Sequence, residues 1–194
     1  MKMVPRCARC TEKKCRTGED CFALADEVKK LYDDEQIREL HRAATAIEGR
    51  HYCREHRLRE TILFAREMGY RKIGLAFCIG LADEVKVVDE ILRQDFDVYS
   101  VCCKNCAIDK KVFEMEQIDD DLVEYMCNPA GQAELLNRAG SEFNLICGLC
   151  IGHDAIFTQL SRAPVSTLIA KDRVLAHNPA GAIYCQYIRR KMMK

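Results

Sequence analysis

The chain has 194 residues, 48% of them hydrophobic, and its equal numbers of basic and acidic residues give a formal net charge of zero. This length and composition are enough to bury one substantial core. The neutral balance argues against nucleic acid or a lipid surface as a partner, and no apolar run approaches the roughly 20 residues of a membrane-spanning helix. The first 21 residues are charged and cysteine-rich where a signal peptide would be apolar, so we expect a cytoplasmic protein.

The N-terminal segment carries four cysteines in the pattern C-x2-C-x4-C-x5-C, at Cys7, Cys10, Cys15 and Cys21. The residues between them are mostly charged or polar and cannot form a core, so a metal bound by four thiolates is expected to order this knuckle. Compact, uneven spacing favours an iron–sulfur cluster, of the four-iron kind, over zinc.

Three helices are predicted next, because apolar residues recur with a helical period over residues 19–32, 35–47 and 54–68. Residues 1–70 are therefore expected to form a helical region with the knuckle at its tip. The chain has thirteen cysteines in all, and a reducing compartment disfavours disulfides. We expect the thiols to be metal ligands, redox groups or buried packing residues, the last including Cys53, Cys102 and Cys185.

The remainder of the chain, residues 71–194, contains an internal duplication with copies at about 72–140 and 143–194. An apolar stretch followed by Cys-Ile-Gly occurs at Cys78 and again at Cys150, and Asn-Pro-Ala-Gly follows both Cys127 and His177. The pattern predicts two strand-helix-strand units and hence an α/β fold with a small, mainly parallel Rossmann-like sheet. The predicted ranges are 72–77, 80–93 and 98–103 in the first copy, and 143–149, 153–160 and 165–170 in the second. The first copy is longer, and an inserted turn with a short helix is expected at 109–126.

The duplicated residues predict a second site where the two copies meet. Ligands of open α/β sheets lie outside the carboxyl ends of the strands, which is where Cys78 and Cys150 fall. Asn-Pro is a typical helix start, so Cys127 and His177 are each expected before a helix N-terminus, where a thiolate is stabilised. The candidate metal ligands are therefore Cys78, Cys127, Cys150 and His177, with Cys103, Cys106 and Cys147 as additional or alternative ligands.

The leading functional hypothesis is an iron–sulfur protein with one or two clusters. The N-terminal cluster would relay electrons or brace the fold, and the second site would bind or reduce a small molecule, with a redox protein as a possible partner class. His153, Asp154, Lys171 and Asp172 are the candidate catalytic residues at this edge. Together with Arg173 they are expected to supply protons or hold an anion.

Two alternatives remain open. One is a zinc-stabilised binding module without catalysis, and the other is a metal-free dithiol reductase that uses the Cys103/Cys106 or Cys147/Cys150 pair. Whether the second site is completed in a homodimer is also open.

The chain resembles a prokaryotic family of uncharacterised cysteine-rich metal-binding proteins of about this length. The resemblance covers nearly the whole chain: the four N-terminal cysteines, Ala76 to Gly80, Cys127-Asn-Pro, Gly148 to Asp154, and Lys171-Asp-Arg followed by His177-Asn-Pro. It implies metal binding and no established reaction. A looser likeness, in architecture alone, is to nickel carbon-monoxide dehydrogenases and hybrid-cluster proteins, which also join a cysteine-knuckled helical region to Rossmann-like units.

Overall fold

The computed structural model describes residues 4–193 and divides into two compact units, one ending at Tyr52 and the other beginning at Cys53. The N-terminal unit contains two short 3₁₀ turns, η1 (Cys7–Arg9) and η2 (Lys14–Thr17), followed by α1 (Ala25–Leu31) and α2 (Glu35–His51). The helix α3 (Arg57–Glu67) belongs to the second unit, where Ile62 and Ala65 pack in the same core as the sheet residue Leu75.

Side-chain caps decide where the N-terminal helices begin. The Asp34 carboxylate accepts the backbone N–H of Ile37 at 3.1 Å and so starts α2. The helix expected at 19–32 is shorter in the structure, because the Asp20 carboxylate accepts the N–H groups of Phe22 and Ala25 and holds residues 20–24 in a turn.

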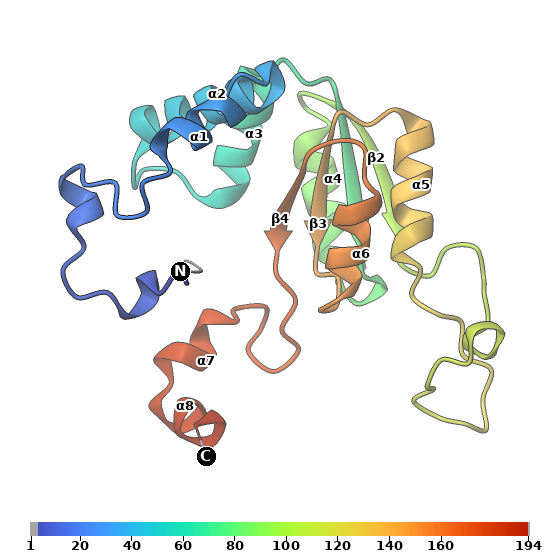
Figure 1. The fold of residues 1–194 in the computed structure, drawn as a ribbon. Coiled ribbons are helices and arrows are strands. Elements are labelled where there is room, and N and C mark those ends of the chain that lie inside the picture. The colour runs from blue at the N-terminus through green and yellow to red at the C-terminus, as the bar shows by residue number, and fades with distance from the viewer. Residues whose placement is uncertain (1–3, 194) are drawn as a thin grey trace. The chain divides into compact units, whose positions relative to one another are not determined.

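The second unit is built on a four-stranded parallel sheet in the order β2-β1-β3-β4 (Figure 1). Its strands are β1 (Lys72–Phe77), β2 (Asp97–Cys102), β3 (Phe143–Cys147) and β4 (Val165–Ile169). The predicted small Rossmann-like sheet is therefore confirmed. The first strands of the two copies, β1 and β3, lie side by side at the centre, and the second strands form the two edges.

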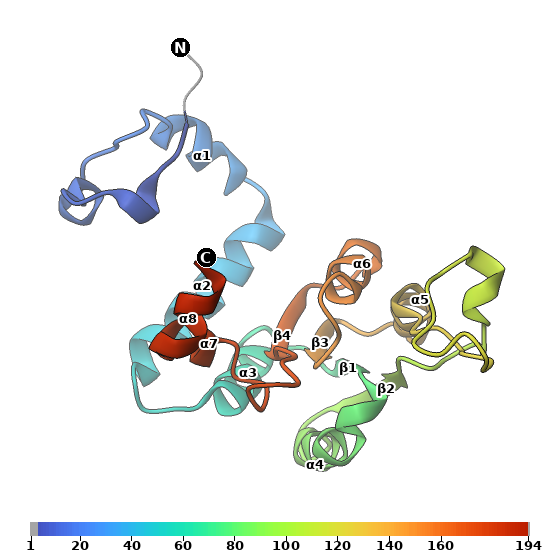
Figure 2. The same ribbon diagram turned by 90° about the horizontal axis from the view of Figure 1, so that it is seen from below.

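Helices cover both faces of this sheet (Figure 2). On one face α4 (Ala82–Leu92), which follows the turn η3 (Ile79–Leu81), packs with α3 against residues such as Leu75. On the other, α5 (Pro129–Ala139) and α6 (His153–Leu160) pack against Ala76 and Ile146. Neighbouring strand residues point to opposite faces, so the mostly apolar central strands supply residues to two cores.

Two further segments leave the carboxyl-terminal edge of the sheet. Between β2 and α5 lies the predicted insertion, residues 109–126, with the short helix η4 (Lys110–Phe113) and a bridge between Asp109 and Tyr125. After β4 the chain forms α7 (Ala180–Tyr184) and α8 (Gln186–Met192). Within residues 4–193, none of the helices has both the length and the apolar character needed to cross a membrane.

Candidate functional site

The centre of the sheet is the point where its connections diverge. From β1 the chain passes to α4 on one face, whereas from β3 it passes to α6 on the other. In open α/β sheets this divergence leaves a crevice outside the carboxyl ends of the two strands, where ligands bind. Cys78 directly follows β1, and two residues separate Cys150 from the end of β3. The strand order places the carboxyl ends of β1 and β3 side by side, and that this edge is the functional one stays a prediction.

Three thiols meet beside this point. Cys78 and Cys103 are buried and Cys127 is half-buried, and the Cys103 thiol lies within hydrogen-bond reach of both others. We call these three residues the thiol site. The backbone fixes them: the Cys103 N–H donates to Phe77 O at 2.9 Å, and the Asn128 N–H, next to Cys127, donates to Cys103 O at 2.8 Å.

Cations and N–H groups surround the three sulfurs. Lys171, which follows β4 in the other copy, donates from Nζ to Cys78 Sγ at 2.6 Å, and the Ile79 N–H donates to Cys103 Sγ at 3.4 Å. The positive charges of Lys104, His153 and Lys171 all act on Cys127. The site is thus arranged to hold negative charge on sulfur.

The acidities of the three thiols differ accordingly. The hydrogen bond from Cys103, followed by the charges of Lys104, His153 and Lys171, outweighs burial and lowers the pKa of Cys127 to about 5. Burial acts to raise the pKa of Cys78, but the hydrogen bonds from Lys171 and the Gly80 N–H prevail and lower it. The pKa of Cys103 is raised, because its proton is shared with Cys127 and because the thiol is buried. At neutral pH the proton therefore stays on Cys103 and the negative charge lies on Cys127.

The second-copy cysteines make other contacts. Cys147 is fully buried in β3, and burial raises the pKa of its thiol to about 12, which suits a packing residue. Cys150 is half-buried, and its Sγ accepts a hydrogen bond from the Arg173 guanidinium at 3.1 Å. Cys106 is exposed and donates from its thiol to Asn105 Oδ1 at 3.2 Å.

The two Asn-Pro segments do not behave alike. Asn128 caps α5 as predicted, with Oδ1 accepting the Gly131 N–H at 2.8 Å. The expected cap by Asn178 is wrong: α7 starts after Pro179 without a side-chain cap. His177 instead belongs to a tight turn in which Ala176 and His177 are both left-handed, and its Nδ1 accepts the Asp172 N–H at 3.1 Å. Sequence identity of the motif did not fix the local structure, because the second copy lacks the packed helix that follows the first.

The four residues predicted to be catalytic divide into two groups. Lys171 and His153 act on the thiol site, as described above. Asp154 and Asp172 have structural partners: Asp154 Oδ1 accepts the Ala155 N–H at 2.8 Å, and Asp172 Oδ1 accepts the N–H groups of Val174 and Leu175.

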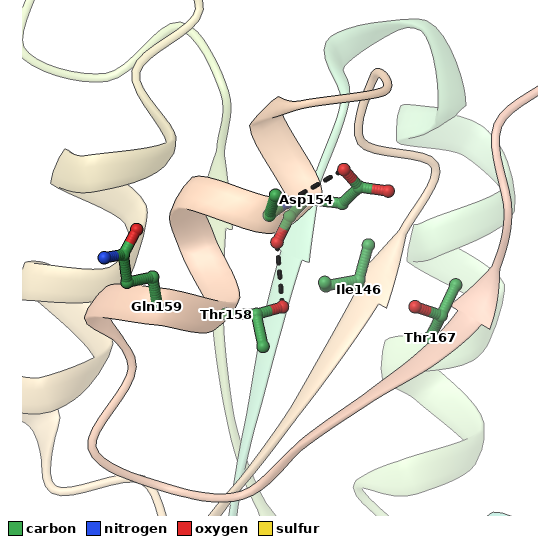
Figure 3. A pocket seen from close by; sticks show the side chains of 6 residues that line it. Ile146, Asp154, Thr158, Gln159 and Thr167 are labelled. Atoms are coloured by element: carbon green, nitrogen blue, oxygen red, sulfur yellow. Dashed lines mark hydrogen bonds between the residues drawn. The ribbon is translucent and has the colours of Figure 1, made fainter. Parts of the chain in front are cut away.

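Asp154 also lines an open depression of about 470 Å³ between α6 and the strands β3 and β4 (Figure 3). Thr158 in this depression donates its hydroxyl hydrogen to Asp154 O, at 2.8 Å, within the same helix. Ile146 and Thr167 line it from the strands, and Gln159 lines it from α6 (Figure 3). The lining lacks any thiol, imidazole or lysine, so the reactive groups are concentrated at the thiol site instead.

The N-terminal knuckle is a separate cluster of exposed thiols. The Lys13 N–H donates to Cys10 Sγ at 3.4 Å, with Lys13 in the left-handed conformation. Desolvation, followed by the charges of Glu19, Cys15 and Cys10, raises the pKa of Cys21. None of the residues of η1 or η2 is buried. Within residues 4–193, no three His, Cys, Asp or Glu side chains are already gathered in the geometry of a metal site.

The sequence analysis missed Gln132. This α5 side chain is fully buried, and its Nε2 donates to Phe77 O at 3.0 Å and to Val101 O at 2.7 Å. It therefore clamps together the ends of β1 and β2, from which Cys78 and Cys103 follow. The available signal was its position four residues before Leu136, on the buried stripe of the helix.

Comparisons of the sequence with known proteins found one matching family model and one similar protein. A family model described as "Protein of unknown function (DUF1847)" matches residues 15–168. The chain belongs to this family. It is also 47% identical over 190 residues to "Uncharacterized protein MJ0455" of Methanocaldococcus jannaschii, an alignment that covers 97% of this chain and 98% of the relative. No solved structure matches the chain.

The span shared with the family contains the whole sheet apart from Ile169, and all three residues of the thiol site. Cys7 and Cys10 of the knuckle precede it, and Lys171, Arg173 and His177 follow it. The alignment with the archaeal relative extends beyond these limits, because it takes in nearly all of both chains.

Replacing Gln132, which joins the ends of β1 and β2, should lower the stability of the protein measurably. In Gln132→Met the carbonyls of Phe77 and Val101 lose their shared donor in a buried setting, so we expect the free energy of unfolding to fall by about 2 kcal/mol. Urea denaturation monitored by circular dichroism gives this value. Glu134→Gln, on the same helix but half-exposed, serves as the control and should change it by less than about 0.5 kcal/mol. Equal stability of the two variants would show that the clamp is energetically unimportant.

Proposed function

We propose that this protein binds metal through cysteine thiolates at two places: an iron–sulfur cluster, of the four-iron kind, in the N-terminal knuckle, and a second cluster or metal at the thiol site. The second centre would bind or reduce a small molecule, and the first would relay electrons or brace the fold. The observation that carries this proposal is the meeting of Cys78, Cys103 and Cys127 at the divergence point of the sheet, among N–H and cationic donors.

The donor set fits a thiophilic metal. Thiolate ligands select zinc, copper(I) or iron–sulfur clusters over hard cations, and two of the three thiols already have lowered pKa values. A metal would take the place of the proton that Cys103 keeps in the thiol site. N–H groups that donate to sulfur tune iron–sulfur centres, and such contacts occur at Cys103 and at Cys10.

Three thiolates leave room for a ligand from outside the protein. A bound metal would supply an open coordination position, and the chain's own residues would surround it with positive charge. Lys171 is poised beside Cys78, and His153 stands near Cys127 at the start of α6. Both carry protons that they can donate to a reduced or anionic small molecule. Cys150, Cys106 and His177 remain alternative ligands that would require their loops to rearrange. Cys147, the last residue of β3, is a weaker alternative because it is fully buried.

The proposal is tested by metal and acid-labile sulfide analysis, with a visible spectrum, on protein purified without oxygen. Two double variants separate the centres: Cys7→Ser/Cys10→Ser for the knuckle and Cys78→Ser/Cys127→Ser for the thiol site. Each should lose about half of the iron and sulfide, since each removes two ligands of one cluster. Cys53→Ser, an exposed cysteine outside both groups, should lose none.

Other outcomes select the alternatives. Protein without iron and sulfide would refute the iron–sulfur proposal. Zinc alone, lost in the knuckle variant, would favour the zinc-stabilised binding module, because closed zinc sites have a structural role and no redox chemistry.

One observation favours a second candidate, metal-free dithiol chemistry. Cys127 is a low-pKa thiolate hydrogen-bonded to the protonated thiol of Cys103. Such a pair can reduce a disulfide substrate: the Cys127 thiolate attacks one substrate sulfur and the other half of the substrate leaves as a thiolate. Cys103 then attacks Cys127 Sγ, which releases the second half and forms a Cys103–Cys127 disulfide. The two protein thiols supply the two electrons, Cys103 supplies one proton and solvent supplies the other. A Cys103–Cys127 disulfide found by mass spectrometry after turnover would identify this route, which differs from the two CxxC pairs that the sequence suggested.

A further inference from the structure

The insertion, residues 109–126, has an ion pair at its centre, whereas its large apolar side chains are exposed. Lys110 and Glu124 form an ion pair at 2.8 Å whose side chains are only 18% and 23% exposed, and Lys110 Nζ also donates to Glu116 O. Around this polar centre the large apolar side chains are exposed, with Ile118 at 91%. The exposed apolar residues of the insertion are Val112, Phe113, Met115, Ile118, Leu122, Val123 and Tyr125.

Hydrogen bonds within the insertion hold it in this conformation. The Ile118 N–H donates to Glu124 Oε2 at 2.8 Å, and Gln117 Nε2 bridges the carbonyls of Asp119 and Leu122. The Met126 N–H donates to Ile108 O at 2.8 Å and closes the base. An ordered loop with outward apolar side chains is unfavourable in water unless a partner covers it, so this surface is expected to be an interface.

The charge of the insertion indicates what that partner is. It contains seven acidic residues against two lysines, and three of the acidic residues are consecutive, Asp119 to Asp121. The tail, residues 180–193, has the opposite composition: it carries Arg189, Arg190 and Lys191 and lacks any acidic residue. Its apolar residues are also exposed, namely Ile183, Tyr184, Tyr187, Met192 and Met193. The two segments are complementary in charge and alike in uncovered apolar surface.

We propose that the insertion is the docking surface for the tail of a second copy of this chain. In a two-fold dimer the contact is made twice, because each copy presents one insertion and one tail. Apolar residues form the centre of the contact, and the Asp119–Asp121 run faces Arg189 and Arg190 at its rim. Both segments leave the carboxyl-terminal edge of the sheet (Figure 1). Along the chain, the insertion ends one residue before Cys127, and the tail begins nine residues after Lys171.

Sedimentation velocity on the full chain tests this proposal. We expect a dimer at protein concentrations of about 50 µM that weakens between about 0.05 M and about 0.5 M salt. Two charge reversals, Asp120→Lys/Asp121→Lys in the insertion and Arg189→Glu/Arg190→Glu in the tail, should each weaken the dimer about tenfold or more. The variant that combines all four changes should recover it, because the charges are complementary again.

The matched control is Glu84→Lys/Glu90→Lys, which makes the same charge change on exposed residues of α4. This control should leave the dissociation constant of the dimer unchanged. Circular dichroism should give the same spectrum for every variant. A monomer at all concentrations would overturn the proposal. The proposal would also be overturned if neither charge reversal changed the dissociation constant of the dimer, or if the combined variant did not recover the dimer.

Discussion

Alkylation of Cys127 by iodoacetamide, in protein freed of metal by a chelator, should follow a pH profile with a midpoint near 5. An ordinary cysteine titrates near its usual value of 9.0, whereas the Cys103 hydrogen bond and the charges of Lys104, His153 and Lys171 lower the pKa of Cys127 to about 5. Only the thiolate reacts, so the rate at Cys127 should rise between about pH 4 and pH 6 and then stay level. Mass spectrometry of the modified peptide, at short reaction times and a series of pH values, measures this profile.

Two variants locate the cause of that shift. In Cys103→Ala the thiolate loses its largest stabilising contact, so the midpoint should move upward by about 2 units or more. Lys171→Met removes a smaller contribution and should move it less. The absolute rate at pH 6 should exceed that of a small model thiol by about tenfold only, because a weakly basic thiolate is also a weaker nucleophile. A midpoint near 9 with Cys103 intact would rule out the shared proton.

Gly74→Ala should be the most damaging single substitution in the sheet. Gly74 pairs with Asn144 across the central strands β1 and β3, and an added Cβ would lie 2.0 Å from Asn144 Oδ1 and 2.9 Å from Leu136 Cδ1. Asn144 cannot move aside easily, since it is fully buried and its Nδ2 donates to Ser161 Oγ at 2.8 Å. We expect the free energy of unfolding to fall by about 3 kcal/mol in urea denaturation.

Two further variants test whether the contact between the added Cβ and Asn144 causes the loss of stability. Gly49→Ala lies in α2 with open space around it, so its stability should rise by up to about 1 kcal/mol through the better helix propensity of alanine. Gly74→Ala/Asn144→Ala should be more stable than the sum of its single changes, because the shortened side chain makes room for the new methyl group. Additive losses in the double variant would place the cost outside the Gly74–Asn144 contact.

Much of the second unit could be predicted from its sequence. The range Lys72–Phe77 is both the predicted and the observed strand β1, and His153–Leu160 likewise matches α6. These elements are short and strongly patterned, and each is preceded by a charged residue or a glycine, so local signals suffice. The helix at 19–32 was overpredicted because the Asp20 contacts that hold a turn compete with helix formation and leave no mark in the periodicity.

Burial of individual cysteines was harder to predict. Cys53 and Cys185 were expected in the core and are exposed, and Cys102 is half-buried. Cysteine is apolar and small enough to occupy either environment, so composition alone does not decide its place. The two metal centres, the cofactor and the likeness to nickel enzymes stay predictions that metal analysis will test.

By itself the sequence determined the parallel α/β sheet, its duplication and the edge at which chemistry-bearing residues gather, because strand and helix periodicity and the Cys-Ile-Gly turns are local properties. Only the tertiary structure decided which of those residues meet. It joined Cys78, Cys103 and Cys127 from one copy with Lys171 from the other, and it left Cys150 with Arg173 and His177 within its own turn. The order β2-β1-β3-β4 brings the carboxyl ends of separate strands together. Contacts between residues far apart in sequence depend on that strand order rather than on the repeat.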